Sequence, residues 1–138
     1  MDNQKFIDLL NEDLETEYQS IVQYVQHIAT VTGAEFMSTV DELRTHVTQE
    51  LQHAITLAEQ VDFLGAVPTT RVPDVPAQAD TRAAIVADLE LETRQLERYR
   101  ERVVQATELG LLDVAEALRP LLTQTQEHVR DLQAVLGQ

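Results

Sequence analysis

The sequence predicts an all-α protein, an antiparallel bundle of four long helices with a long crossover between the second and the third. Three observations support this prediction. Apolar residues recur at alternating steps of three and four along four segments, glycines follow the segments, and three of the four prolines fall in a single stretch. No segment alternates apolar and polar residues in the way that is typical of a strand.

The chain length fits one domain. Its 138 residues, of which 43% are hydrophobic, are enough to bury a single core without disulfides or other covalent links. We therefore expect one domain over residues 1–138. It divides into a helical hairpin over 1–65, a crossover over 66–80 and a second hairpin over 81–138.

The first hairpin is expected to contain helices over 3–32 and 35–64. Gly33 and Gly65 stand just beyond the two apolar patterns, where a helix C-cap commonly has glycine. The first turn is too short for any arrangement other than an antiparallel pair of neighbours.

The second hairpin is expected to contain helices over 81–109 and 111–136. Asp80 is a good N-cap for the first of these helices, and Gly110 marks the turn between them. Pro120 lies inside the last helix and lacks the N–H that would bond to the preceding turn, so we expect a kink or a short break there.

The crossover GAVPTTRVPDVPAQAD begins at Gly65 and cannot be helical throughout, because it holds three prolines. About 15 extended residues span about 50 Å, whereas a helix of about 30 residues is about 45 Å long. The segment can therefore run the length of the bundle, which would make the second and third helices parallel. A loose loop in an up-down-up-down bundle is the alternative.

Charge and composition exclude several classes of function. Twenty-four acidic residues against ten basic ones give a net charge of −14, which disfavours binding to nucleic acid. The absence of cysteine excludes disulfides, thiolate metal sites and cysteine nucleophiles. With no apolar run long enough to cross a membrane and no signal peptide at the start, we expect a cytoplasmic protein that does not bind membranes.

Each apolar pattern is interrupted near its middle by a residue able to bind a metal or a proton. The interrupting residues are Glu17, Glu50, Glu92, Thr125 and His128, with His53 one turn beyond Glu50. The first five lie 15–18 residues from the glycine of their own hairpin turn. Equal distances from the turn of an antiparallel hairpin mean equal height, so these groups should meet at one level of the core.

An internal repeat supports the same site. An offset of 75 positions places Glu17, Tyr24, Glu50 and His53 on Glu92, Tyr99, Thr125 and His128. The apolar positions follow the same offset, so the chain resembles two related hairpins around a pseudo-twofold axis. One half offers Glu with Glu-x-x-His, and the other offers Glu with Thr-x-x-His.

Three carboxylates and two imidazoles in a core need a partner. An unpaired buried carboxylate costs several kcal/mol, and neighbouring carboxylates repel one another. The central positions include no Lys or Arg, so a bound divalent metal is the simplest source of countercharge. Carboxylate with imidazole suits iron, manganese or zinc, and the i, i+3 spacing of Glu50 and His53 places both on one helix face.

The motifs resemble the ferritin-like superfamily, and its bacterioferritin and rubrerythrin branches in particular. ETEYQSIVQY (15–24) is similar to the ligand segment of the first helix, ELQH (50–53) to the Glu-x-x-His of the second, and DLELE (88–92) to the segment of the third. His128 falls where a second Glu-x-x-His would end. The resemblance covers essentially the whole chain in helix order and crossover position.

The resemblance implies a ferritin-like iron-binding protein whose buried di-iron carboxylate site oxidises Fe(II) with dioxygen or peroxide, as a ferroxidase or another di-iron oxidoreductase. The implied metal ligands are Glu17, Glu50, His53, Glu92 and His128, with Glu50 bridging the two ions. A redox or hydrogen-bonding role is implied for Tyr24, and a homodimer or larger homo-oligomer is the expected assembly. Whether the outcome is iron storage, peroxide removal or oxidation of an organic substrate stays open.

Three features depart from the family pattern. Thr125 replaces the fourth, bridging carboxylate, which leaves one or two bound metals open. Glu127 is a poor substitute, because adjacent helical positions point about 100° apart. Leu51 stands where bacterioferritins have a haem-ligating methionine, so no haem is expected. The sequence ends at Gln138 without the short fifth helix of the large cages. Thr125 also supports an alternative: a catalytically lapsed helical module that binds one structural metal or none and serves protein interaction.

The remaining polar residues receive simpler interpretations. Tyr24 and Tyr99 should be core residues whose hydroxyls bond to a ligand carboxylate. His27 and His46 have no partner at a matching height, so we expect them at the surface or, at most, beside the ligands. The acidic cluster of Glu12, Asp13 and Glu15 is expected to be a solvated helix face.

Overall fold

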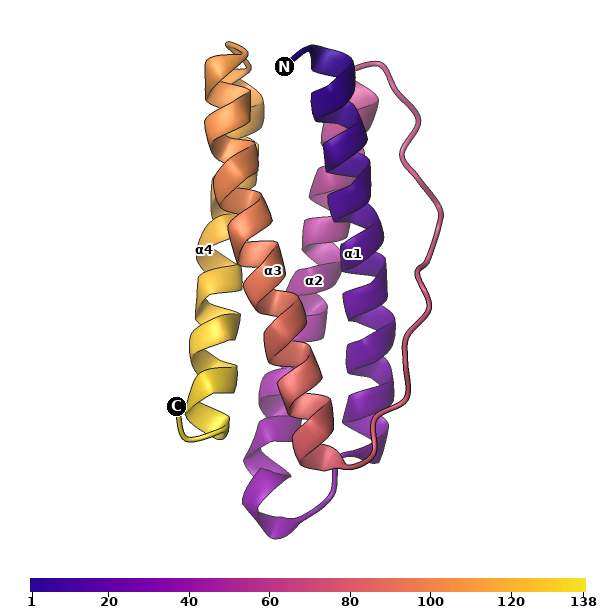
Figure 1. The fold of residues 1–138 in the computed structure, drawn as a ribbon, viewed down its shortest axis with the longest axis vertical. Helices are drawn as coiled ribbons and strands as arrows, with labels where there is room; N and C mark the ends of the chain where they lie inside the picture. Colours follow the sequence, from indigo (N-terminus) through magenta and orange to yellow (C-terminus); the bar gives the residue numbers. More distant parts are fainter.

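The computed structural model describes residues 1–138 and shows four long helices without a strand (Figure 1). They are α1 (Asn3–Thr30), α2 (Met37–Phe63), α3 (Thr81–Glu108) and α4 (Leu112–Val135), and a short 3-10 turn, η1 (Ala34–Phe36), precedes α2. Within the hairpins α1 packs on α2 and α3 on α4, while α1–α3 and α2–α4 contacts join the hairpins. The predicted all-α bundle is confirmed. None of the helices combines the length and the apolar character that a membrane span requires.

The segment between α2 and α3 runs along the bundle beside α1, so that α2 and α3 point in the same direction (Figure 1). Side chains of α1 hold it in place. The Tyr18 hydroxyl donates to the Thr69 carbonyl at 3.0 Å, and the Thr69 N–H donates to Asn11 Oδ1 at 2.9 Å. The predicted long crossover is therefore confirmed, and the alternative up-down-up-down arrangement is excluded.

The helix ends follow the expected capping chemistry. Asp2 and Asp80 cap α1 and α3, each accepting a backbone N–H of the first turn at 2.8 Å. Gly65 and Gly110 follow α2 and α3 with φ of 89° and 77°, a conformation that residues with a Cβ rarely adopt. Gly33 differs, because α1 ends three residues earlier and this glycine lies in the turn before η1.

The helix α4 continues through Pro120 from Leu112 to Val135, so the expected short break is absent. Leu118 and Leu121 on either side of the proline are buried in the core. Their burial favours a continuous helix, since even one missing backbone hydrogen bond is offset by apolar contacts on both sides.

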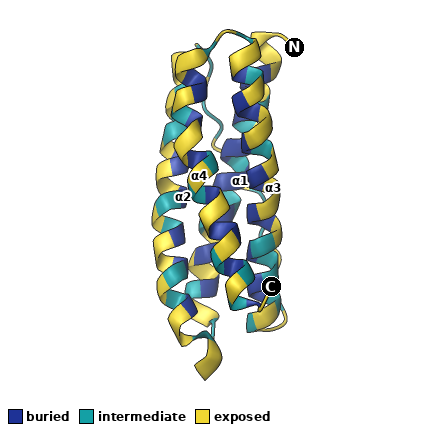
Figure 2. Cartoon of the chain, turned by 90° about the vertical axis from the view of Figure 1, so that its left-hand side faces the viewer, coloured by how far each residue is buried: buried dark blue, intermediate teal, exposed yellow.

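The core consists of two apolar clusters with a polar layer between them. Buried residues lie along the inner faces of all four helices (Figure 2). The larger cluster includes Leu14, Leu57 and Leu121, and the smaller includes Leu43 and Leu132. On every helix the residues that join the two clusters in sequence are the polar ones predicted above. The fold therefore places these residues at mid-height in the bundle.

Candidate metal centre

The five predicted ligands meet in the polar layer. They are Glu17 from α1, Glu50 and His53 from α2, Glu92 from α3 and His128 from α4, and each is at most 1% exposed. Two overlapping groups bring their ligand atoms within 4.8 Å of one another: Glu17, Glu50 and His53, and Glu50, Glu92 and His128. Glu50 belongs to both groups, so it lies where a bridging carboxylate would.

The two imidazoles turn the same nitrogen toward the centre. His53 Nδ1 lies 3.6 Å from Glu17 Oε1 and 3.4 Å from Glu50 Oε2. His128 Nδ1 lies 3.0 Å from Glu50 Oε1 and 3.4 Å from Glu92 Oε1. The pair thus shows the twofold relation that the repeat predicts.

A glutamine holds the outer nitrogen of each ring. His53 Nε2 lies 2.7 Å from Gln124 Oε1, and His128 Nε2 lies 2.5 Å from Gln49 Oε1. An amide oxygen only accepts hydrogen bonds, so each Nε2 is the donor and each neutral ring keeps its lone pair on Nδ1. This is how a neighbouring acceptor fixes the tautomer of a metal-binding histidine.

The two buried tyrosines hold the two outer carboxylates. The Tyr24 hydroxyl donates to Glu92 Oε1 at 2.9 Å, and the Tyr99 hydroxyl donates to Glu17 Oε1. Gln95 Nε2 donates to the same Glu17 oxygen at 2.9 Å. Burial, together with the nearby carboxylates, raises the pKa of both tyrosines well above the usual value. Both hydroxyls therefore stay protonated and act as donors, as the sequence predicted.

The three carboxyls do not ionise equally in the absence of metal. Burial, reinforced by Glu17 and Glu92, raises the pKa of Glu50 well above the usual value. Burial opposes the ionisation of Glu17 and Glu92 as well, but the proximity of Glu50 and of the nearby histidines lowers both pKa values, that of Glu92 to about 2. One proton, held by Glu50, therefore lies between two ionised carboxylates.

Four polar atoms of the predicted ligand side chains are buried without a hydrogen-bond partner. They are Oε2 of Glu17, Glu50 and Glu92, and Nδ1 of His53. Buried polar atoms are nearly always paired, so four unpaired atoms at one level call for a ligand. Carboxylate oxygens and an imidazole nitrogen are suitable donors for iron, manganese or zinc. The residues present therefore fit a pair of divalent metals.

Two residues at which the chain departs from the family pattern, Thr125 and Glu127, add no carboxylate to the centre. Thr125 is fully buried, and its hydroxyl donates to the Leu121 carbonyl of its own helix at 2.7 Å. It supplies no charge to the centre. Glu127 is exposed, so it does not replace the missing carboxylate.

His46 is buried, and the surface position considered for it is wrong. Its Nδ1 lies 3.2 Å from the Tyr24 hydroxyl, its Nε2 lies 3.1 Å from Asp131 Oδ2, and its ring stacks on His128 at 4.0 Å between centroids. The prediction considered height along the hairpins, whereas these partners come from the helices on either side. His46 is thus a neighbour of a ligand histidine.

His27 and Asp13 are also buried, which corrects both surface expectations. His27 Nδ1 lies 2.9 Å from both carboxylate oxygens of Asp88. Asp13 is fully buried and accepts from Arg102 Nε at 2.8 Å and Nη2 at 3.3 Å. Burial raises the pKa of Asp13 to about 7, against the opposing pull of Arg102. Each residue pairs across α1 and α3, a relation that the pattern of a single helix cannot show.

The repeat contained the signal for the residues that were missed. The offset of 75 positions that relates His53 to His128 also relates Gln49 to Gln124. Applied to α1, it relates Asp13 to Asp88 and His27 to Arg102. The two buried pairs between α1 and α3 therefore occupy positions that the repeat relates to each other, and each pair joins the two halves.

Comparisons with known proteins agree with this architecture. The family model described as "Ferritin-like domain" matches residues 7–138. The bacterioferritin of Mycobacterium leprae is 25% identical over 134 residues, which cover 94% of this chain and 84% of that protein. A bacterioferritin of Mycobacterium tuberculosis is 26% identical over 129 residues, with 93% and 81% covered.

Two solved structures are similar over nearly the whole chain. A crystal structure described as that of ferritin-like, diiron-carboxylate proteins from Bacillus anthracis superposes with a TM-score of 0.92 and 29% identity, with 99% of each chain covered. The structure of a mycobacterial bacterioferritin gives a TM-score of 0.86 and 25% identity, with 97% of this chain and 84% of that chain covered.

Proposed function

The chain belongs to the ferritin-like domain family, and we propose that it binds two iron ions in the buried centre and oxidises Fe(II) with dioxygen or peroxide. One observation supports this proposal above all others. Two groups of three buried ligands share Glu50, and four of their polar atoms lack any partner within the protein. A protein that used this layer only for packing would have no reason to bury these charges.

The proposed ligand set divides evenly. Glu17 and His53 would hold one ion, Glu92 and His128 would hold the other, and Glu50 would bridge them. Bound iron supplies the one-electron redox changes by which dioxygen or peroxide is reduced. Manganese or zinc is compatible with the same donors, so the identity of the metal is part of the proposal.

The protein residues orient the ligands and exclude water. Gln49 and Gln124 fix the two rings so that Nδ1 faces the centre. Tyr24 and Tyr99 each donate to a ligand carboxylate and so limit how far it can rotate. Tyr24 also contacts His46, and a proton on its hydroxyl is therefore within reach of both an imidazole and a carboxylate. We assign Tyr24 a hydrogen-bonding role in the reaction on this basis.

Anaerobic titration of the metal-free protein with Fe(II), followed by admission of oxygen, tests the proposal. We expect two ions per chain and a rapid rise of near-ultraviolet absorbance when oxygen enters. Glu50→Ala should lose both the binding and the absorbance change. Glu59→Ala, an exposed glutamate of the same helix, is the matched control and should behave as wild type. Unchanged binding and oxidation in Glu50→Ala would rule out the assignment.

Thr125 favours one alternative, a ferritin-like module that holds a single structural ion and serves protein interaction. The centre then has three carboxylates, and the Thr125 hydroxyl is already engaged with its own helix. The same titration distinguishes the two functions. One ion per chain, with a raised melting temperature and no oxidation, would support the alternative.

We further propose that the chain forms a homodimer or a larger homo-oligomer. The family relationship supports this assembly. Light scattering coupled to size-exclusion chromatography measures it directly, and a mass of one chain would contradict it.

A further inference from the structure

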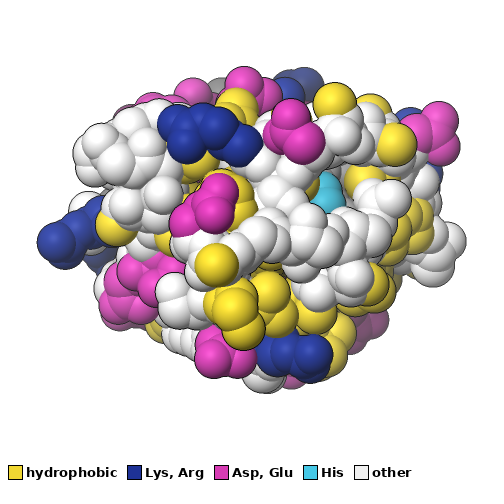
Figure 3. Space-filling view, turned by 90° about the horizontal axis from the view of Figure 1, so that it is seen from below, with side chains coloured by type: hydrophobic (Ala, Val, Ile, Leu, Met, Phe, Trp, Pro, Cys, Tyr) yellow, Lys and Arg dark blue, Asp and Glu magenta, His cyan; other side chains and the backbone are white.

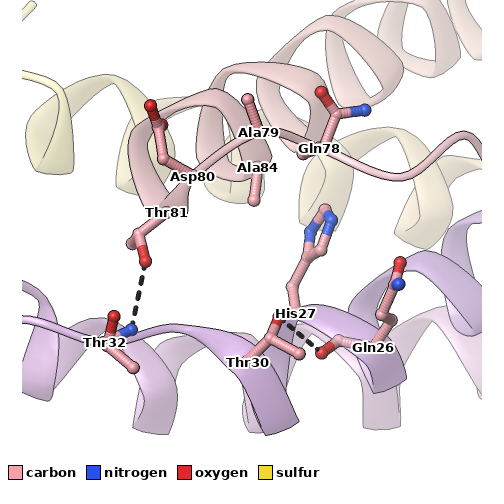
Figure 4. A pocket seen from close by; sticks show the side chains of 9 residues that line it. All are labelled: Gln26, His27, Thr30, Thr32, Gln78, Ala79, Asp80, Thr81 and Ala84. Atoms are coloured by element: carbon pink, nitrogen blue, oxygen red, sulfur yellow. Dashed lines mark hydrogen bonds between the residues drawn. The ribbon is translucent and has the colours of Figure 1, made fainter.

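A second polar feature lies at the end of the bundle where α1 finishes and α3 begins. A pocket of about 400 Å³ opens there, between α1, the end of the crossover and the first turn of α3. Figure 4 shows the His27 ring rising from α1 into this space, toward Gln78 and Ala84. The pocket is separate from the centre described above, none of whose ligands lines it.

His27 lines the pocket and carries a ring nitrogen without a partner. The residue is 2% exposed, its Nδ1 lies 2.9 Å from Asp88, and its Nε2 is buried with no partner. Gln23 Nε2 donates to the same carboxylate at 2.8 Å and fixes it in place. A carboxylate that accepts from Nδ1 leaves the lone pair of a neutral ring on Nε2. This arrangement is shared by metal-binding histidines, which usually donate their other nitrogen to a carboxylate.

The pair that the repeat relates to His27 and Asp88 shows what a purely structural version looks like. The position equivalent to His27 is Arg102, which forms two hydrogen bonds with Asp13 and a third with Gln105. A guanidinium has donors only and offers no lone pair to a ligand. An imidazole is therefore not needed to join α1 to α3. An imidazole nitrogen, unlike a guanidinium, can also bind a metal ion.

The charge of the pocket favours a cation. Asp80 lines it, Asp88 lies behind the ring, and no Lys or Arg lines it. Figure 3 views the bundle from below, where acidic and basic side chains are scattered among uncharged and hydrophobic atoms. The other polar lining consists of threonine hydroxyls and glutamine amides. Each water needs about 30 Å³, so the pocket has room for an ion with several water molecules.

We propose that this pocket binds one divalent transition-metal ion through Nε2 of His27, with water molecules as the remaining ligands, held by Asp80 and the neutral polar lining. The proposal adds a third ion to the two of the proposed function and depends on that function only for its choice of cation. Because the site has a single imidazole ligand, it should bind a metal ion more weakly than the centre does. Asp88, which contacts His27, precedes Glu92 by one helical turn, about 6 Å along α3.

Titration of the metal-free protein with Co(II) alone, which air does not readily oxidise, tests the proposal. We expect three ions per chain, the third binding more weakly than the first two. Nuclear magnetic resonance of the histidine ring nitrogens, with the protein labelled with nitrogen-15, should show His27 Nε2 broadened or strongly shifted as the third ion binds. An unaffected His27 signal at three equivalents would overturn the proposal, and this measurement needs no variant.

Two variants of the pair give a second readout. His27→Gln keeps a donor for Asp88 but has no imidazole, and it should bind one Co(II) fewer than wild type while the first two bind unchanged. Asp88→Asn should retain the site with at least about tenfold weaker affinity, because it weakens the group that orients the ring. Wild-type stoichiometry in His27→Gln would contradict the proposal.

Glu50→Ala separates this inference from the proposed function. That variant should lose the two central ions and keep the one at His27. If wild type bound a single Co(II) that was lost in His27→Gln and kept in Glu50→Ala, the di-iron function would be wrong and the pocket site would stand. If Glu50→Ala lost the signal at His27 as well, the ion would belong to the centre and the pocket proposal would be wrong.

Discussion

Replacing Glu50 by glutamine should stabilise the metal-free protein and abolish its response to metal. Burial and its two carboxylate neighbours raise the pKa of Glu50, which favours the protonated form in the metal-free protein. Glutamine has the same shape and donates hydrogen bonds at every pH. It therefore reproduces the protonated layer and removes the only carboxylate shared by the two ligand groups.

The magnitude in the metal-free state follows from proton linkage. A carboxyl whose pKa is raised on folding favours the folded state at low pH, and that contribution falls as the pH rises from the unfolded pKa, here 4.5, toward the folded pKa. The fall is about 1.4 kcal/mol per pH unit. Glutamine does not titrate, so metal-free Glu50→Gln should match wild type near pH 4 and exceed its stability at pH 7 by on the order of 1–3 kcal/mol.

The metal reverses the order of stability. Two ions present at one hundred times their dissociation constants stabilise the folded wild type by about 2.7 kcal/mol each. For a chain of this length about 5 kcal/mol corresponds to a rise in melting temperature of roughly 15 °C. The wild type should show this rise, and Glu50→Gln should show little of it.

Circular dichroism at 222 nm measures both effects, by urea unfolding of the chelated proteins at pH 4 and pH 7 and by thermal unfolding with and without Co(II). A metal-free Glu50→Gln less stable than wild type at pH 7 would show that Glu50 is ionised in the folded protein. An equal rise in melting temperature for both proteins would show that Glu50 does not bind metal.

Three further results are expected. Metal affinity should increase from pH 5.5 to 7.5, because the ions displace the proton of Glu50. Calorimetry in buffers of different ionisation enthalpy would count the protons released. An affinity that did not change with pH would contradict the protonation of Glu50. Asp13→Asn or Arg102→Met should each lower the free energy of unfolding by about 3–5 kcal/mol, because each leaves a buried group unpaired. The double variant Asp13→Leu with Arg102→Met should lower it much less. Additive losses in urea unfolding would contradict the pairing. Gln124→Ala should weaken metal binding at least about tenfold, because His53 Nε2 loses the acceptor that orients the ring. Titration with Co(II) measures the affinity. An unchanged affinity would show that the glutamine does not orient the ring.

The bundle was predictable because its determinants are local. The step of three and four, the glycines and the cluster of prolines each act within a few residues, and they define the four helices and the crossover. The level of the centre was predictable for a related reason, since the hairpin turn converts sequence distance into height. Glu17, Glu50 and Glu92 needed no further information to be brought together.

The residues around the centre required knowledge of which helices face each other. His46 was missed because Tyr24 comes from one neighbouring helix and Asp131 from another, so no single helix records the contact. Asp13 was assigned to the solvent for the same reason, since nothing in its own helix pointed to a buried partner such as Arg102. A polar residue in a helix is buried only if another helix supplies its counterpart.

The repeat explains which of these misses could have been avoided. Pairs that occur in both halves, such as Gln49 with His128 and Gln124 with His53, are visible as matched offsets. His46 has no such equivalent, because the offset places it on Leu121. Symmetric contacts are therefore recoverable from the sequence, and asymmetric ones need the structure.

The structure also changes how the missing carboxylate acts. An absent ligand at Thr125 would be expected to weaken one metal position more than the other. Instead, each of the two ligand groups keeps one outer carboxylate, one imidazole and the shared Glu50. If both groups bind metal as proposed, the loss of a bridge is divided equally between the two positions, and both depend on Glu50. This dependence is why a single isosteric change at Glu50 should remove both ions together, where the loss of either imidazole should leave one.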